Sequence, residues 1–323
     1  MILSERDKKI FCLGLIKKDI NLLNQVAKSD LHCHADRGAN KKDIEMEFGV
    51  SIEEPPVFES IADMDSWYDK NIDKYAAGFT GLVRRYKSLF KTAENQNIKI
   101  FSPSFCLSRI KYFDGSVEEY IKLIKQLKDC YAPNVEFFPE LVLNRSNDIS
   151  HIEKEFELAS KYDFFKSIDI IGDESLGTEK FKEIYQEANK LGWILKAHVG
   201  EFGGVDIIED AILNLHLDVI NHGISAIDSP NMMRYLKTEN IKLNICPTSN
   251  ILLSRVKNYK EHPIGKFVKE GITCSINTDD LLIINQTLGE EYLNLYNNQT
   301  LSIEELNKVR EDGLTKMLVK RPN

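Results

Sequence analysis

The chain has 323 residues, more than the ~150 residues typical of one domain, but a length that a single α/β barrel often reaches. Charged residues make up 28% of it and hydrophobic residues 42%, which excludes intrinsic disorder and indicates an ordinary globular protein. Acidic residues outnumber basic ones by 50 to 42, giving a net charge of −8. An acidic chain without a basic run is a poor binder of nucleic acid.

The apolar segments are too short for a membrane, and the cysteines are too scattered for a disulfide framework. No stretch approaches the ~18 apolar residues of a transmembrane helix. Charges throughout the N-terminal MILSERDKKIFCLGLIKKD argue against a signal peptide. The six cysteines form no C-x-x-C pair, which indicates reduced thiols in a cytoplasmic protein without a membrane partner.

A strand-like run followed by a helix-like run recurs along the chain. The strand candidates are short and apolar: Asp30–Ala35, Ile98–Phe105, Val135–Leu143, Ser167–Ile171, Trp193–Ala197, Asp218–Asn221, Lys242–Cys246 and Thr273–Asn277. Apolar residues recur at helical spacing between them, as in Val117–Lys128, Thr178–Gly192 and Ser229–Glu239. Eight strands alternating with helices predict a parallel sheet closed into a (β/α)8 TIM-type barrel, with residues 1–323 forming one domain.

The first connection is longer than the others. Later strands follow one another at roughly 25 to 35 residues, the size of one βα unit, whereas roughly 60 residues separate the first two. Segment 36–97 therefore predicts extra helices, around Met64–Tyr75 and Leu82–Ala93, that cover the C-terminal mouth as a lid or form a subunit contact. The oligomeric state stays open. A doubly wound sheet is the alternative, but it predicts a glycine-rich phosphate turn that the sequence lacks.

Two histidines stand two residues apart on the first predicted strand, in DLHCHAD. Residues at this spacing point to the same face of a strand, so His32 and His34 face the barrel axis while Cys33 faces the helices. One strand thereby offers two nitrogen ligands to one metal. Two core histidines are the alternative, but two inward imidazoles without a metal would need other polar partners.

Further polar side chains follow later strands at the same end. His198 ends WILKAH, and the turn at Gly200 returns Glu201 to the pocket mouth. His222 follows the strand DVIN. In a barrel, side chains at these strand ends converge on one pocket.

The eighth strand ends in CSINTDD, which places Asp279 and Asp280 side by side. Neighbouring carboxylates on a strand face different ways, so the two have different roles. Three histidines and a carboxylate, His32, His34, His198 and Asp279, form a plausible catalytic zinc site with water as a further ligand. A structural zinc site would more typically use cysteine thiolates, and only Cys246, in CPTSN, falls at a strand end beside the histidines.

Six ordered motifs resemble the adenosine deaminase family of metal-dependent hydrolases, and they span nearly the whole chain: DLHCHAD, IIGDES, AHVGE, NHG, CPTSN and NTDD. The resemblance implies one zinc ion per chain, held by the three histidines and Asp279. It implies zinc-dependent hydrolytic deamination of adenosine or a related 6-aminopurine nucleoside or base, a step of purine metabolism that releases ammonia and the 6-oxo purine. The partner is then a small-molecule purine.

The resemblance also assigns roles to individual residues. Glu201 would protonate the ring nitrogen beside the attacked carbon, and His222 would orient the attacking water and assist its deprotonation. The backbone N–H of Gly172 and the carboxylate of Asp280 would contact the purine, and Asp36 the sugar. A buried carboxyl is easier to protonate than an exposed one, which suits the role of Glu201 as an acid.

The departures from the family pattern fall around the substrate. The family commonly has H-x-H-L-D-G after the first strand, where this chain places Arg37 ahead of the glycine. Arg37, Arg109 and Arg145 are either solvated or bind an anionic group such as phosphate. The reaction type is therefore better supported than the substrate, and a modified or anionic aminopurine is an alternative.

Two other functions compete with deamination. One is an amidohydrolase acting on another cyclic C–N bond or on a phosphoester, but two-metal versions need a bridging lysine at the end of strand four, where this chain has Ile171-Gly172-Asp173. The other is a barrel that binds a purine without turning it over. Pseudoenzymes usually lose a ligand or the acid, and this chain retains both.

Overall fold

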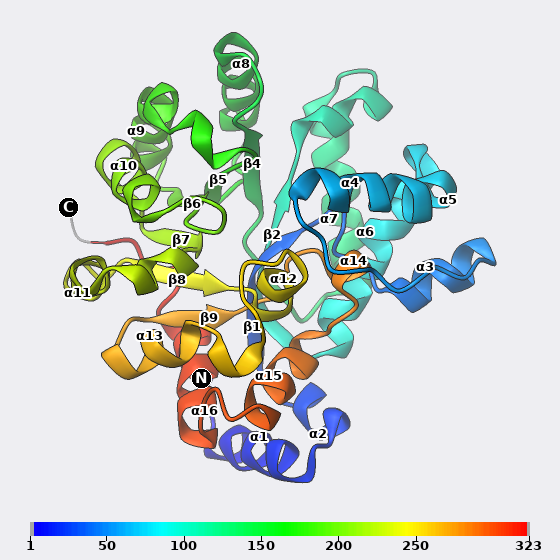
Figure 1. Cartoon of the computed structure of the whole chain (residues 1–323). Coiled ribbons are helices and arrows are strands. Elements are labelled where there is room, and N and C mark those ends of the chain that lie inside the picture. The colour runs from blue at the N-terminus through cyan, green and yellow to red at the C-terminus, as the bar shows by residue number, and fades with distance from the viewer. Residues whose placement is uncertain (1–2, 322–323) are drawn as a thin grey trace.

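The computed structural model describes residues 3–321, and its sheet is a nearly closed barrel of eight parallel strands (Figure 1). The barrel strands run in the order β1-β2-β4-β5-β6-β7-β8-β9, and the short β3 pairs with β2 beside them. Their bounds are β1 Lys28–His34, β2 Ile98–Phe105, β3 Glu136–Phe137, β4 Glu140–Asn144, β5 Ser167–Ile171, β6 Ile194–Val199, β7 Val219–His222, β8 Lys242–Ile245 and β9 Cys274–Ile276. The (β/α)8 barrel predicted from the sequence is confirmed.

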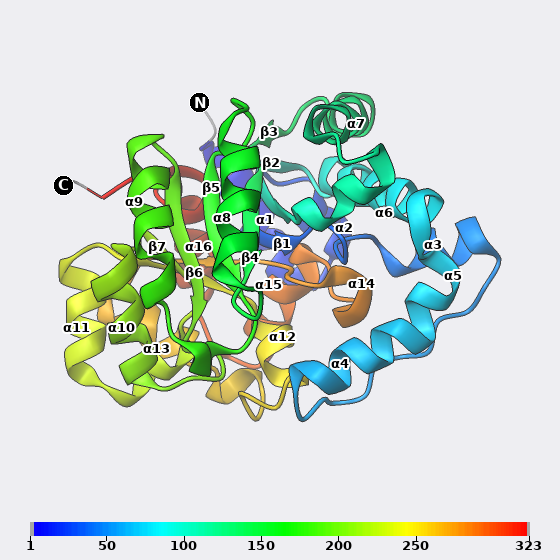
Figure 2. The ribbon, with the colours of Figure 1, turned by 90° about the horizontal axis from the view of Figure 1, so that it is seen from above.

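Helices surround the barrel strands (Figure 2). Their bounds are α1 Glu5–Lys17, α2 Ile20–Asn24, α3 Lys41–Phe48, α4 Ile61–Tyr68, α5 Lys74–Ala76, α6 Gly78–Asn95, α7 Val117–Tyr131, α8 Ile149–Ser160, α9 Lys182–Lys190, α10 Val205–Leu215, α11 Pro230–Thr238, α12 Pro247–Leu252, α13 Ile264–Glu270, α14 Leu281–Ile284, α15 Leu288–Asn297 and α16 Ile303–Thr315. Within residues 3–321, no helix is both long enough and apolar enough to cross a bilayer.

The third predicted strand is interrupted. It divides into β3 and β4, with Phe138 and Pro139 between them. Proline has no backbone N–H to donate to a neighbouring strand, so the ladder breaks there. Both halves pair with β2, through Phe101 opposite Phe137 and Ser104 opposite Glu140. The interruption therefore leaves the order of the barrel strands unchanged.

The barrel closes between β1 and β9 through a narrow contact. One parallel bridge joins Cys33 to Asp279. In it, the His34 N–H donates to the Asp279 carbonyl at 3.1 Å, and the Asp279 N–H donates to the His32 carbonyl at 3.0 Å. Helix α16 packs against both strands. This closure holds the residues that follow β9 beside the two histidines of β1.

The connection between β1 and β2 forms a helical layer with its own apolar cluster. Helices α3 to α6 and a π-helical turn at Asp69–Asp73 occupy it, so the helices expected around 64–75 and 82–93 are confirmed. Met64, Tyr68 and Ile72 pack there with Leu253 and Leu282 from the loops after β8 and β9. The layer is therefore anchored to the barrel end at which strands β8 and β9 finish.

Candidate active site

A cavity of about 730 Å³ opens at the C-terminal end of the barrel strands. Its walls come from the ends of β1, β2, β4, β5, β6 and β7, from the segment after β9 and from α4. All nine residues assigned to the site from the sequence line it or touch its floor: His32, His34, Asp36, Gly172, His198, Glu201, His222, Asp279 and Asp280. The fold thus brings together side chains that are far apart in the sequence.

Three imidazoles converge at the bottom of this cavity. His32 and His34 come from β1 and His198 from β6, and their ligand nitrogens lie within 4.8 Å of one another. The ring centroids of His32 and His198 are 4.6 Å apart. The Ser104 hydroxyl, 3.0 Å from Nδ1 of His34, and the Asp169 carboxylate, 2.7 Å from Nδ1 of His198, hold two of the rings from behind. Such outer contacts orient histidine ligands in metal sites.

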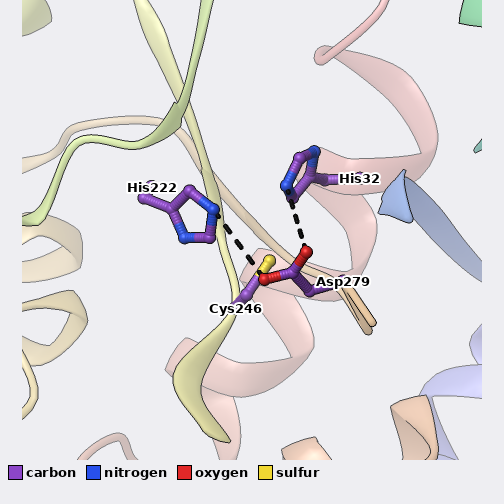
Figure 3. Close-up of side chains that lie close together, drawn as sticks. All are labelled: His32, His222, Cys246 and Asp279. Atoms are coloured by element: carbon purple, nitrogen blue, oxygen red, sulfur yellow. Dashed lines mark ion pairs between the residues drawn. The ribbon is translucent and has the colours of Figure 1, made fainter. Parts of the chain in front are cut away.

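Asp279 completes this group. Its Oδ1 lies 3.6 Å from Nε2 of His32 and 3.4 Å from Nε2 of His34. Figure 3 shows its carboxylate between His32 and His222. The backbone of Asp279 has φ +57°, and that of His222 has φ +66°, a left-handed conformation that costs free energy in residues other than glycine. Backbone strain of this kind clusters at functional sites.

The donor set fits a cation. His32 is completely buried, and neither of its ring nitrogens has a hydrogen-bond partner among residues 3–321. Burial, followed by neighbouring imidazoles, lowers the pKa values of His32, His198 and His222 well below the usual value, so these rings are neutral at pH 7. The pKa of His34 is instead raised, because nearby aspartates outweigh the effect of burial. Imidazoles and carboxylates are ligands that zinc accepts, and a cation would satisfy the orphaned nitrogens of His32.

Cys246, the one cysteine that the sequence places at a strand end beside the histidines, approaches the same group. Its sulfur belongs to a cluster with His32, His222 and Asp279 whose ligand atoms lie within 4.8 Å of one another (Figure 3). Burial, with Asp279 second, raises the pKa of its thiol well above the usual value. The neutral thiol is therefore a weak ligand beside the three imidazoles.

Glu201 stands on a turn that another carboxylate holds in place. Four successive backbone N–H groups donate to Glu174: Gly200 at 2.6 Å and Gly203 at 3.2 Å to Oε2, and Glu201 at 3.1 Å and Phe202 at 2.9 Å to Oε1. Gly200 has φ +72°, which this tight turn requires. The motif IIGDES contains Glu174, but its place in the cradle depends on the fold.

The side chain of Glu201 is buried beside His222. Its Oε1 lies 3.3 Å from Nδ1 of His222, and 3.1 Å from the amide nitrogen of Asn250, which donates to it. Burial, followed by the charges of Asp279 and Glu174, raises the pKa of Glu201 well above its usual value. A carboxyl in this state carries a proton at neutral pH and can give it to a base in the cavity.

Asp36 and Asp280, assigned to the substrate, already hold arginines. Asp36 accepts hydrogen bonds from the Tyr86 hydroxyl at 3.0 Å and from Nε of Arg109 at 2.8 Å. Oδ2 of Asp280 accepts from Arg37 at 3.3 Å, whereas its buried Oδ1 has no hydrogen-bond partner among the described residues. That free oxygen is an acceptor available to a ligand in the cavity.

The arginine that departs from the family pattern joins two parts of the mouth. Besides Asp280, Arg37 donates to Asp65 of α4 at 2.5 Å, and its guanidinium lies over the Tyr68 ring at 4.7 Å. Arg37 therefore connects the helical layer to the segment after β9. Gly172, with φ +97°, also lines the cavity, where the side-chain oxygen of Asn144 lies so close that a Cβ at Gly172 would meet it at 2.9 Å.

Comparison with known proteins identifies the family. A family model described as adenosine deaminase matches residues 141–322. The chain belongs to the adenosine deaminase family. Its sequence is 25% identical over 314 residues to an adenine deaminase of Marinomonas sp. (strain MWYL1), covering 92% of each chain. The resemblance seen in the sequence is thus confirmed, and the chain is a hydrolase that acts on carbon–nitrogen bonds by deamination.

Solved structures of low sequence identity share the fold. An amidohydrolase of Burkholderia ambifaria with bound Zn superposes with a TM-score of 0.71 at 18% identity, covering 97% of this chain and 88% of its own. The apo N6-methyl-AMP deaminase of Arabidopsis thaliana superposes with a TM-score of 0.74 at 16% identity, covering 92% and 94%. Members with this barrel therefore include proteins named for a nucleotide substrate.

Proposed function

We propose that this protein catalyses the zinc-dependent hydrolytic deamination of adenosine or a related 6-aminopurine nucleoside or base. Water and the purine would give ammonia and the 6-oxo purine. The observation that carries the proposal is the meeting of three imidazoles and a carboxylate, around the orphaned nitrogens of His32, with the buried acid Glu201. The same cavity thereby offers a cation site and a proton donor.

His32, His34, His198 and Asp279 would hold one zinc ion per chain. When bound, such an ion makes water acidic enough to be a nucleophile near neutral pH. Asp169 and Ser104 would keep His198 and His34 in the ring orientations that this requires. Two of the ligands lie on one strand and Asp279 on the closing bridge, so the barrel itself sets their separation.

Glu201 would act on the ring nitrogen next to the amino-bearing carbon. As the water oxygen bonds to that carbon, the proton of Glu201 passes to the ring nitrogen, so no full negative charge develops on the purine. One proton of the attacking water would then pass to the exocyclic nitrogen, so that the C–N bond breaks and ammonia leaves, and its other proton would restore the acid form of Glu201. His222 would orient the water, since it lies next to both Glu201 and Asp279.

The remaining assigned residues would hold the purine. Asp280, whose Oδ1 is free, and Gly172 both line the cavity, which suits contacts from the carboxylate and from a backbone N–H to the edges of a flat ring. Asp36 would contact a ribose at the rim, where Tyr86 and Arg109 fix its carboxylate.

The charge of the cavity favours an uncharged substrate over an anionic aminopurine. Arg37 and Arg109 are already paired with carboxylates, and the buried Arg145 donates to the backbone carbonyl of His198 at 2.6 Å. Besides the protonated Glu201, seven acidic side chains line the cavity against two arginines: Asp36, Glu59, Asp65, Asp173, Glu174, Asp279 and Asp280. A phosphate would meet repulsion there. The six cysteines are free thiols, which suits a cytoplasmic location.

Ammonia release by the purified, zinc-loaded protein tests the proposal, with the ultraviolet change from amino to oxo purine as a check. Adenosine, deoxyadenosine, adenine and AMP are compared at equal concentration, and chelated protein is the control. We expect turnover of adenosine or adenine to exceed that of AMP by at least about tenfold. Preference for AMP would contradict the uncharged substrate, and no turnover of any 6-aminopurine by zinc-bound protein would contradict the proposed reaction.

A further inference from the structure

The side-chain amide of Asn250 touches both residues that the proposed reaction uses for proton handling. Asn250 lies in α12 and is completely buried. Its Nδ2 lies 3.1 Å from Oε1 of Glu201 and 3.0 Å from Nδ1 of His222. An amide nitrogen carries two hydrogens, so this one nitrogen can donate to both groups. Neither contact was anticipated from CPTSN, the motif that contains Asn250.

A second histidine fixes which way this amide points. Nδ1 of the buried His262 accepts the backbone N–H of Ile264 at 3.2 Å, so its proton must sit on Nε2. Nε2 lies 3.3 Å from Oδ1 of Asn250 and donates to it. Burial lowers the pKa of His262 to about 3, so the ring stays neutral throughout the physiological range. A flipped amide would set its NH2 against the N–H of His262.

This orientation determines where two protons reside. Because the amide of Asn250 donates to Nδ1 of His222, that nitrogen is unprotonated, and the proton of the neutral ring sits on Nε2. Nε2 lies on the side of Asp279, at 3.8 Å from its Oδ2. Because Oε1 of Glu201 also accepts from the amide, the acidic proton of Glu201 is left on Oε2. Both protons then face away from Asn250.

We infer that Asn250 and His262 are positioning residues that hold His222 in the Nε2–H tautomer and place the acidic proton of Glu201. The inference rests on the proposed function for its catalytic consequence, but the tautomer is a property of the protein alone. It sharpens the role of His222, which presents an N–H that orients the oxygen of the attacking water. Second partners that fix a histidine tautomer have this effect in other sites.

The backbone at Asn250 is held independently of the side chain. Its carbonyl accepts the N–H groups of Arg255 at 2.8 Å and Val256 at 2.9 Å, and its own N–H donates to the carbonyl of Cys246 at 3.1 Å. A change confined to the amide therefore leaves these main-chain bonds in place. Asn250→Asp keeps the shape of the side chain and replaces the donor by an acceptor, so it is the informative variant.

Nitrogen NMR of zinc-loaded protein with 15N-labelled histidine reads the tautomer directly. The signals of His222 are assigned from their loss in His222→Gln. We expect Nδ1 of His222 to be unprotonated in the parent protein, and protonated in Asn250→Asp because the new carboxylate accepts a hydrogen bond from it. A protonated Nδ1 in the parent protein, or an unprotonated one in the variant, would overturn the inference whether or not the protein deaminates purines.

Kinetics measures the catalytic consequence. Because the amide lies behind the catalytic groups and not in the purine site, Asn250→Asp should lower kcat by about 10²-fold, with KM within about threefold. Asn250→Ser, which removes both donors without adding a charge, should also lower kcat. Asn258→Asp, the same change in the loop that follows α12, is the matched control and should leave kcat unchanged. A kcat within about threefold of the parent value in both Asn250 variants would overturn the positioning role.

Two substitutions of His262 test whether its Nε2–H orients the amide of Asn250. His262→Gln retains an N–H at the place of Nε2, whereas His262→Leu removes it, so only the leucine variant should lower kcat, by about tenfold or more. Thermal unfolding shows whether each variant folds. Equal loss in both variants would overturn the role of His262 in orienting the amide. If the parent protein releases no ammonia from any 6-aminopurine, the proposed function fails, and the NMR experiment alone decides the tautomer.

Discussion

The floor of the cavity and its mouth are built in different ways. On the floor, His32, His34 and His198 project from strands of one sheet, and the β1–β9 bridge fixes Asp279 beside them. At the mouth, Arg37 reaches from a loop to Asp65 on an inserted helix and to Asp280. The floor is set by backbone hydrogen bonds and the mouth by side-chain ion pairs. The floor should therefore tolerate less change, and the mouth should govern which substrate enters.

Loss of the metal should have the largest effect on turnover. It tests whether the residues on the floor of the cavity act through a bound cation. Treatment with a chelator, or His198→Gln, should lower turnover by about 10⁴-fold or more, because the proposed reaction needs the cation that the three imidazoles and Asp279 would share. His151→Gln changes an exposed histidine of α8 and should leave turnover unchanged. Metal analysis and ammonia release measure the outcome. Full activity after the metal has been removed would mean that the floor does not depend on a cation.

Glu201→Gln should give the next largest effect on turnover. It distinguishes the loss of the proton donor from the loss of the cation. The amide keeps the shape of the side chain but has no acidic proton, so kcat should fall by about 10²- to 10⁴-fold while zinc content stays that of the parent protein. Zinc analysis and single-turnover kinetics check both expectations. Undiminished turnover would remove Glu201 from its role as acid. Parallel loss of zinc would place Glu201 among the ligands.

The difference between floor and mouth also explains how much could be predicted from the sequence. Hydrophobic periodicity located the strands to within a few residues, and the H-x-H spacing placed His32 and His34 on one face, because a strand alternates strictly. Only the division at Pro139 was missed, although proline signals such a break. The ordered motifs indicated the family.

Other contacts could not be predicted because they depend on how side chains turn after the fold has formed. The Glu174 cradle and the contacts of the Asn250 amide join segments from different strand ends. The sequence left Arg37 either solvated or free to bind an anion, whereas it lies in two ion pairs. No local pattern specifies a partner far away in sequence, so these pairs need coordinates.

Glu174→Gln should have an intermediate effect on kcat. The change loosens the turn that carries Glu201 but leaves the residues proposed to contact the purine in place. Its amide NH2 would face backbone N–H groups that now donate to a carboxylate, so part of the cradle is lost. A small displacement of a catalytic group costs up to about 10²-fold, so kcat should fall by about 10- to 10²-fold with little change in KM. Glu179→Gln, in the next exposed turn, is the matched control. A KM effect alone would assign Glu174 to substrate binding.

Substitutions at the mouth should have the smallest effects on turnover. Two variants separate the ion pair of Arg37 with Asp65 from its ion pair with Asp280. Asp65→Asn removes only the contact to α4; because Asp65 is half exposed, KM should rise by about two- to fivefold. Arg37→Met also leaves the buried Asp280 without its partner, so KM should rise by about tenfold or more, with kcat changed less. Arg84→Met, an arginine change on α6, is the control.

Hydrogen exchange of residues 61–68 shows whether these ion pairs hold a lid. Binding of a purine inhibitor should slow exchange in α4 of the parent protein, because Arg37 ties the helix to Asp280, which is proposed to contact the ring. The slowing should be smaller in Asp65→Asn and absent in Arg37→Met. Exchange in α4 that is unchanged by the inhibitor would make the helical layer a fixed wall or a subunit contact. Arg37 would then act on Asp280 alone.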